Sequence, residues 1–173
     1  MFSPADAAGP FRQGEIIASL VDYVFDPETE ELAEYAYEYG VVLAQDCDLE
    51  RFHAGLPAAD APVLVFPASD AEAGREAAGL NSKEWRVARG NNNPRYHVIE
   101  RCPEEMEHGD GLPDLMIDFR RFFVLQHDQL RKQVGAGQAV RRTRLLEPYR
   151  EHLQFRAMFY LGRVALDPPH NVP

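Results

Sequence analysis

The segment Gln45-Asp46-Cys47-Asp48 places a thiol between two carboxylates, directly after the short apolar run Gly40–Ala44. This run contains two β-branched valines and suits a strand that is buried on both faces. Side chains at the end of a core strand are held in place while remaining open to solvent, which suits a functional site. Cys47 is therefore a candidate nucleophile, with Asp46 and Asp48 as candidate binding groups.

A second interpretation of Cys47 is structural. A catalytic thiol must ionise and needs a base nearby, and flanking carboxylates disfavour the ionised form. As metal ligands, the three residues lie too close along the chain to form a zinc site unaided, and His53 or His97 would have to complete it. We favour a small buried core cysteine with the two aspartates capping a turn. No metal or cofactor is predicted.

Arg95-Tyr96-His97 follows an asparagine-rich loop and forms the second candidate. Arg95 and Tyr96 can hold a phosphate or stack on a base, and His97 can carry a proton near pH 7. Arg95 and His97 are thus candidate catalytic residues, with Tyr96 as a binding residue. The alternative is that these residues form the solvent-facing side of a half-buried strand.

Arg141, Arg142 and Arg144 form a phosphate-binding patch if they share one face of a strand. The range 22–50 is acidic and the range 120–163 holds most of the arginines. We therefore favour internal salt bridges for these three side chains. The net charge of −10 argues against a general nucleic-acid binder, because affinity for nucleic acid depends on neutralising phosphates.

A chain of 173 residues that is 45% hydrophobic suits one globular domain. We place this domain at residues 13–166, between a flexible arm (1–12) and a tail (167–173). No apolar run approaches the ~20 residues that span a bilayer, so no membrane partner is expected. The N-terminus lacks the features of a secretory signal, so the expected location is the cytoplasm. A homodimer is an open alternative.

The elements that position these candidates are mostly short strands. Helices are expected after Ser69 or Asp70 to about Leu80, as one turn at 128–133, and from Pro148 onward. The last helix has an apolar stripe at Leu146, Tyr149, Leu153, Ala157, Tyr160 and Val164, and 167–169 ends it. Strands are expected at 13–25, 34–44, 63–66 (ended by Pro67), 85–89, 95–101 and 138–146, with a turn at 26–31. Two more, 114–119 and 121–125, are either separate or one strand bent around two arginines.

This order contains no alternation of strands and helices that would favour a parallel sheet. It predicts an α+β domain, built either on a compact antiparallel SH3-like barrel or on a strongly bent sheet, with a C-terminal helix.

The order of parts resembles the MazF/PemK-like toxins, which have an SH3-like barrel and a C-terminal helix. Gln13-Gly-Glu-Ile-Ile17 is similar to their opening strand, and Gly40-Val-Val-Leu-Ala44 to their second strand. The segment 123–131 and the later Arg144-Leu145 are similar to their closing strand and the residues after it. The resemblance covers both ends of the chain and little of residues 51–112.

Those toxins cleave single-stranded RNA without a metal, using an arginine before the second strand and a serine or threonine elsewhere. Here Tyr37-Glu38-Tyr39 stands before that strand. The resemblance therefore implies a bacterial binding or regulatory module, acting on a protein or single-stranded nucleic-acid partner without the ribonuclease activity. The alternative is a ribonuclease or other hydrolase that uses Arg95 and His97, or Cys47. Convergence of these three residues in one cleft would favour the enzyme.

Overall fold

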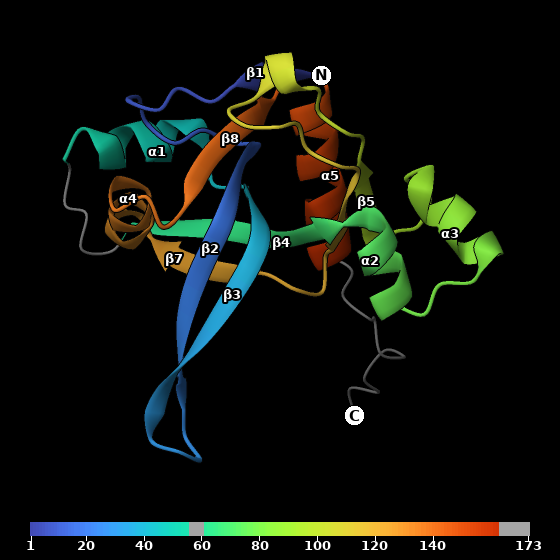
Figure 1. Cartoon of the computed structure of the whole chain (residues 1–173), viewed down its shortest axis with the longest axis horizontal. Helices are drawn as coiled ribbons and strands as arrows, with labels where there is room; N and C mark the ends of the chain where they lie inside the picture. Colours follow the sequence, from blue (N-terminus) through green and yellow to red (C-terminus); the bar gives the residue numbers. More distant parts are fainter. Residues whose placement is uncertain (56–60, 163–173) are drawn as a thin grey trace, which may run out of the picture.

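The computed structural model describes residues 1–55 and 61–162 (Figure 1). The strands are β1 (Phe2–Pro4), β2 (Glu15–Asp26), β3 (Glu31–Val42), β4 (Pro62–Asp70), β5 (Tyr96–Ile99), β6 (Leu115–Asp118), β7 (Phe123–Gln126) and β8 (Val140–Leu145). The α-helices are α1 (Asp46–His53), α2 (Ala71–Ala77), α3 (Ser82–Arg89), α4 (His127–Gly135) and α5 (Tyr149–Leu161). None of the described helices is long and apolar enough to cross a bilayer.

The strands form one antiparallel sheet in the order β1-β8-β2-β3-β4-β6-β5, with β7 paired to β4. The edge strands β1 and β5 do not pair with each other, so the sheet is open. Figure 1 shows β2 and β3 running steeply through the view while β4 and β7 run across it. The fold is therefore α+β with a bent antiparallel sheet and a C-terminal helix. Of the two predicted alternatives, the bent sheet is the one present.

Both faces of the central strands are buried, as the run Gly40–Ala44 predicts. Val41 packs in one core cluster with Leu153 of α5. Val42 points the opposite way and packs in a second cluster with Leu49 of α1 and Leu130 of α4. Because side chains alternate along a strand, each face needs its own helical cover.

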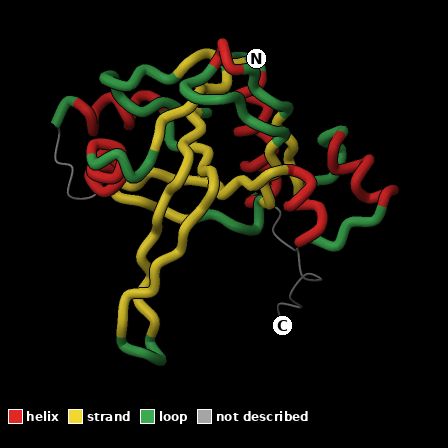
Figure 2. Tube along the Cα trace, in the orientation of Figure 1, coloured by secondary structure: helices red, strands yellow, loops and turns green. Residues whose placement is uncertain are grey.

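The β2–β3 hairpin contains a change of face at Ser19, whose φ is 59°. Ile17 and Leu20 lie three residues apart and contact the same core cluster, although strict alternation would put them on opposite faces. The predicted bulge in this strand also occurs, because the register with β8 shifts between Ile16 and Ile17. Beyond Ser19 the two strands extend away from the rest of the sheet (Figure 2).

Strands β6 and β7 pair with the same edge of β4. Ala68 pairs with Ile117 of β6, and Val65 pairs with Phe123 of β7. The two are thus one strand interrupted at residues 119–122, around the two arginines, as one of the predicted alternatives had it. The prediction that Pro67 ends the preceding strand is wrong. Pro67 lies between the stretches of β4 that pair with β7 and with β6. Its missing backbone N–H therefore leaves no hydrogen bond of the sheet unmade on that edge.

Residues 85–89 are helical, which corrects the predicted strand. Asn81 and Glu84 form a reciprocal capping box that begins α3. Trp85 and Ala88 are the buried residues of this helix, one turn apart. The predicted helix after Asp70 is confirmed, and the Asp70 side chain accepts hydrogen bonds from the N–H groups of Glu72 and Ala73.

Strand β5 is buried along its whole length rather than half-buried. Tyr96 and Val98 pack against Trp85 of α3 in a third cluster. Ile99 belongs to the cluster that contains α5. Helices on both sides of β5 therefore remove the solvent-facing side that the sequence suggested.

Residues 1–12, expected as a flexible arm, pack onto the sheet. Strand β1 pairs with β8, and Phe2, Ala5 and Phe11 are buried. At the other end α5 confirms the predicted C-terminal helix, although it ends at Leu161, with Gly162 as its C-cap, and not at 167–169. Its Leu153 and Ala157 are fully buried, whereas Tyr149 of the same predicted stripe is exposed. Val164 and residues 167–173 lie outside the described residues.

Candidate functional site

The Asp46-Cys47-Asp48 segment forms the first turn of α1, with Gln45 as the N-cap residue. Cys47 is exposed, so the favoured prediction of a buried core cysteine is wrong. Its thiol lies 3.5 Å from the side-chain oxygen of Gln45. Leu49 is the buried residue of α1, and Phe52 packs partly buried against the same core cluster.

Asp46 joins three elements. Its carboxylate accepts a hydrogen bond from the N–H of Gln13 at 2.7 Å, just before β2. Its other oxygen pairs with the Arg150 guanidinium of α5 at 3.0 Å. Arg150 also contacts Glu147 and Glu151, and the hydrogen bond that it donates to the Glu151 carboxylate is the largest influence that raises the pKa of Arg150. Both oxygens of Asp46 are thus occupied in holding the fold together.

Arg95 and His97 point to opposite faces of the sheet. Arg95 donates two hydrogen bonds to Asp118, at 2.9 and 2.6 Å, and lies 4.5 Å from the ring centroid of Tyr96. His97 points towards α5, where its ring lies 5.7 Å from that of His152. Tyr96 itself is buried, so little of its ring is available to a ligand.

His97 is buried, and its Nδ1 has no hydrogen-bond partner among the described residues. Burial, reinforced by the charges of Arg156 and His152, lowers the pKa of His97 to about 3. The imidazole is therefore neutral at pH 7 and enclosed. This environment suits a core residue better than a proton carrier.

Cys47, Arg95 and His97 do not meet in one cleft. Cys47 lies at the start of α1, and Figure 1 shows α1 and β5 at opposite sides of the molecule. Asp48 lines a small cavity of about 290 Å³ between the start of α1 and α5, beside Gln154 and Met158. In residues 1–55 and 61–162 no group of three or more His, Cys, Asp or Glu side chains is arranged to hold a metal ion.

Arg141 and Arg142 form internal ion pairs, as we favoured, and do not share a face. Arg141 is buried beside Glu15, with a 2.9 Å contact, and also donates to the carbonyls of Gly9 and Pro10. Arg142 pairs with Glu107, with a 3.0 Å contact. Arg144 is half-buried and lies opposite Ser3 and Glu15 in the ladders of β8. These arginines therefore do not form a phosphate patch.

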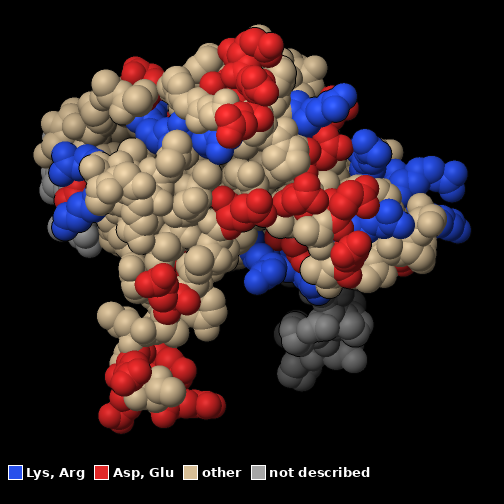
Figure 3. Space-filling model, viewed as in Figure 1, with Lys and Arg blue, Asp and Glu red and all other residues tan. Residues whose placement is uncertain are grey.

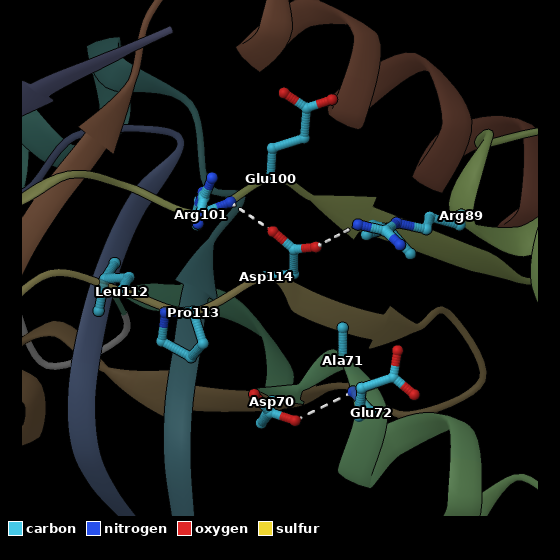
Figure 4. A pocket seen from close by; sticks show the side chains of 10 residues that line it. Asp70, Ala71, Glu72, Arg89, Glu100, Arg101, Leu112, Pro113 and Asp114 are labelled. Carbon is cyan, nitrogen blue, oxygen red and sulfur yellow. Dashed lines mark hydrogen bonds and ion pairs between the residues drawn. The ribbon is translucent and has the colours of Figure 1, made fainter.

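A cavity of about 760 Å³ lies between the start of α2 and the chain that links β5 to β6 (Figure 4). Asp114 is central to it and accepts hydrogen bonds from the N–H of Arg101 at 2.8 Å and from the Arg89 side chain at 3.1 Å. Asp70 is occupied as the cap of α2. The two aspartates that line the cavity are thus already hydrogen-bonded to residues of neighbouring elements.

Sequence reasoning missed the most distinctive surface, the outer part of the β2–β3 hairpin. We call residues 20–37 the ribbon. It exposes apolar side chains on both faces: Tyr23, Val24, Phe25, Leu32 and Tyr35 are between 45% and 68% exposed. It also carries six carboxylates and no lysine or arginine. Figure 3 shows acidic side chains gathered at its tip. The acidic range 22–50 was the available signal.

Both edges of the ribbon are open beyond Val21. Val21 exchanges two hydrogen bonds with the Gln133 side chain, so its backbone N–H and C=O point away from β3. By the alternation of an antiparallel pair, the backbone groups of Tyr23 and Phe25 point the same way. On the other strand, those of Glu34 and Leu32 point outward. No described strand pairs with these groups.

A second surface, the ribbon groove, lies between β3 and α2. It is a hollow of about 570 Å³ with residues 35–37 of the ribbon along one wall. Its charged and aromatic lining consists of Tyr35, Tyr37, Glu38, Arg95, Tyr96, Asp118, Arg120 and Arg121. Figure 3 shows basic atoms in this angle between the ribbon and α2. The two arginines at the break in the predicted strand were the sequence signal for it.

Comparison with known proteins adds no identification. No family model matches the chain, and no curated protein matches it.

Proposed function

We propose that this chain is a protein-binding module that engages a basic partner protein through its ribbon. The observation that carries the proposal is the ribbon itself, which displays apolar side chains, acidic side chains and two open strand edges on one projection. Contiguous exposed apolar surface on a folded protein marks a site of interaction. An open strand edge can also receive a strand from a partner.

The charge of the ribbon specifies the partner. Six carboxylates surround the apolar residues, and the cross-strand pairs place acid beside aromatic ring, as in Tyr23 with Glu34 and Asp22 with Tyr35. Such a surface attracts a basic protein and repels the phosphates of a nucleic acid. The partner is therefore a protein with a basic surface around an apolar cleft.

The hydrolase alternative has less support. Arg95 is paired with Asp118, and His97 is enclosed. Cys47 is accessible, but the neighbouring Asp46 serves Gln13 and Arg150 rather than a reacting group. A relationship between this chain and the MazF/PemK-like toxins stays a prediction, and the proposed binding role does not depend on it.

The test is site-specific photo-crosslinking in cells of the source organism. A photoreactive amino acid replaces Phe25 in one variant and Val87 of α3, which is also exposed, in the control. We expect a defined basic protein to crosslink at position 25 and not at position 87. A crosslink to RNA, or equal crosslinking at both positions, would contradict the proposal.

The partner so identified is then titrated with the purified chain. The cross-strand neighbours Phe25 and Leu32 are changed together to serine. We expect affinity to fall at least about tenfold, because a few central side chains carry most of the binding energy of an interface. The wild-type affinity should also weaken with added salt.

A further inference from the structure

The ribbon groove contains a cluster of basic side chains on a strongly acidic protein. Three guanidinium groups, from Arg95, Arg120 and Arg121, line it against the two carboxylates of Glu38 and Asp118. The groove is thus locally positive on a chain of net charge −10. Such a local reversal of sign favours a negatively charged ligand.

Asp118 fixes the positions of two of these arginines. It accepts two hydrogen bonds from Arg95 and a third from the Arg120 side chain at 3.3 Å. It also accepts from the backbone N–H of Arg120 at 3.1 Å, and its carbonyl accepts from the N–H of Arg121 at 2.9 Å. Asp118 therefore holds the interruption between β6 and β7 in a conformation that exposes the side chains of Arg120 and Arg121.

The outer arginines retain donor capacity for a ligand. The guanidinium of Arg120 contacts Asp118 through one nitrogen only, and the side chain is 54% exposed. Arg121 is exposed and makes no ion pair with any described residue. Because a guanidinium presents five N–H donors in a rigid fork, two adjacent arginines suit a compact anion with several oxygens.

The remaining walls of the groove suit a small ligand. Tyr37 is fixed by stacking on Phe123 of β7, with ring centroids 4.4 Å apart, and Tyr35 stands exposed at the rim. Pro67, Ala68 and Ala78 supply short side chains, so the hollow is not filled. Its volume of about 570 Å³ lies within the range of small-molecule sites.

We propose that the ribbon groove binds a small organic dianion, either a phosphate monoester or a dicarboxylate. Arg120 and Arg121 donate hydrogen bonds to the anionic oxygens of the ligand. Arg95, which is paired with Asp118, adds positive charge to the site, and the ring of Tyr35 packs over the ligand. The groove shares Tyr35 and Tyr37 with the ribbon, but its anion-binding arginines lie outside residues 20–37, and the proposal does not depend on the partner protein.

The experiment is calorimetric titration of the full chain at low ionic strength with glycerol 3-phosphate, malonate and inorganic phosphate, with glycerol as the uncharged control. We expect at least one dianion to bind with Kd below about 1 mM and glycerol not to bind. Comparison of the first two probes decides between a phosphate monoester and a dicarboxylate. Binding of inorganic phosphate alone, or of no probe at about 10 mM, would overturn the proposal.

The matched variants are Arg120→Gln/Arg121→Gln and the control Arg51→Gln/Arg86→Gln, whose arginines are exposed on α1 and α3. We expect the first pair to weaken binding at least about tenfold and the second to leave it unchanged. Equal affinities for the two double variants would overturn the assignment. If Arg120→Gln disturbs folding through its contact with Asp118, Arg121→Gln alone tests the same point, because Arg121 has no ion pair to lose within residues 1–55 and 61–162.

Discussion

Gln133 and Val21 exchange two hydrogen bonds across 112 residues of sequence, 3.0 Å from the Val21 N–H and 2.7 Å to its carbonyl. The side-chain amide of Gln133 thus takes the place of a neighbouring strand where β2 extends beyond its pairing with β8. Gln133 belongs to α4 and is buried. This contact anchors the base of the ribbon to the helix beside it.

Replacing Gln133 with Ala should lower the free energy of unfolding by about 1–3 kcal/mol, because it leaves the backbone groups of Val21 without a partner. Urea unfolding measures the change. Gln138→Ala is the control, since that side chain is exposed. Equal stabilities of the two variants would mean that water replaces the amide without cost.

Acid should destabilise the fold through His97. Its pKa falls from 6.5 to about 3 on folding, so the unfolded chain binds the proton more strongly. Stability is therefore lost as pH falls below about 6.5, at about 1.4 kcal/mol per pH unit. Between pH 7 and 5, wild type should lose about 2 kcal/mol more than His97→Leu.

Chemical denaturation of both proteins at the two pH values gives this difference, and NMR titration of the imidazole gives its pKa directly. A midpoint for His97 near neutrality would show that the ring reaches solvent, and would revive its candidacy as a proton carrier.

The two cysteines should differ sharply in reactivity towards a thiol reagent. Cys47 is exposed at the start of α1, whereas Cys102 is buried and burial raises its pKa. We expect one equivalent to react quickly in the native protein and the second only on unfolding. Cys47→Ser should change stability by less than about 0.5 kcal/mol. Peptide mapping that assigns the fast site to Cys102 would refute this arrangement.

Leu153 should be the strongest anchor of α5. It is fully buried between the helix and the sheet. Leu153→Ala should cost about 2–5 kcal/mol of unfolding free energy. Met158→Ala on the same helix is the control, because Met158 is 55% exposed and should change little. An unchanged thermal midpoint for the Leu153 variant would place the helix elsewhere.

The spacing of apolar residues was sufficient to predict an element correctly where the pattern was compatible with only one secondary structure. The helical spacing of Leu153 and Ala157 predicts α5, and the valines at 41 and 42 predict a strand covered on both faces. Both are confirmed because the pattern there reflects burial directly. The α+β class and the bent sheet follow from the same patterns.

The remaining features depend either on a local polar pattern that apolar periodicity does not register or on tertiary contacts that no local pattern encodes. Residues 85–89 hold too few apolar residues to distinguish helix from strand, and the capping pair Asn81 and Glu84 decided the outcome. Likewise, the engagement of Asp46 by Arg150 arises from residues 104 positions apart. Candidate site residues were chosen by chemical type, and chemical type does not reveal whether a charged group already has a partner.

Because the strand changes face at Ser19, the ribbon can differ in length without altering the packing of the core. Beyond that residue the two strands pair in unbroken register from Leu20 with Tyr37 to Asp26 with Glu31. Deleting two residues from each strand would shorten the projection and keep every remaining side chain on its own face. Deleting one residue from each strand would move every side chain beyond the deletion to the opposite face. Ribbons in related chains should therefore differ in length by two residues per strand, or by multiples of two.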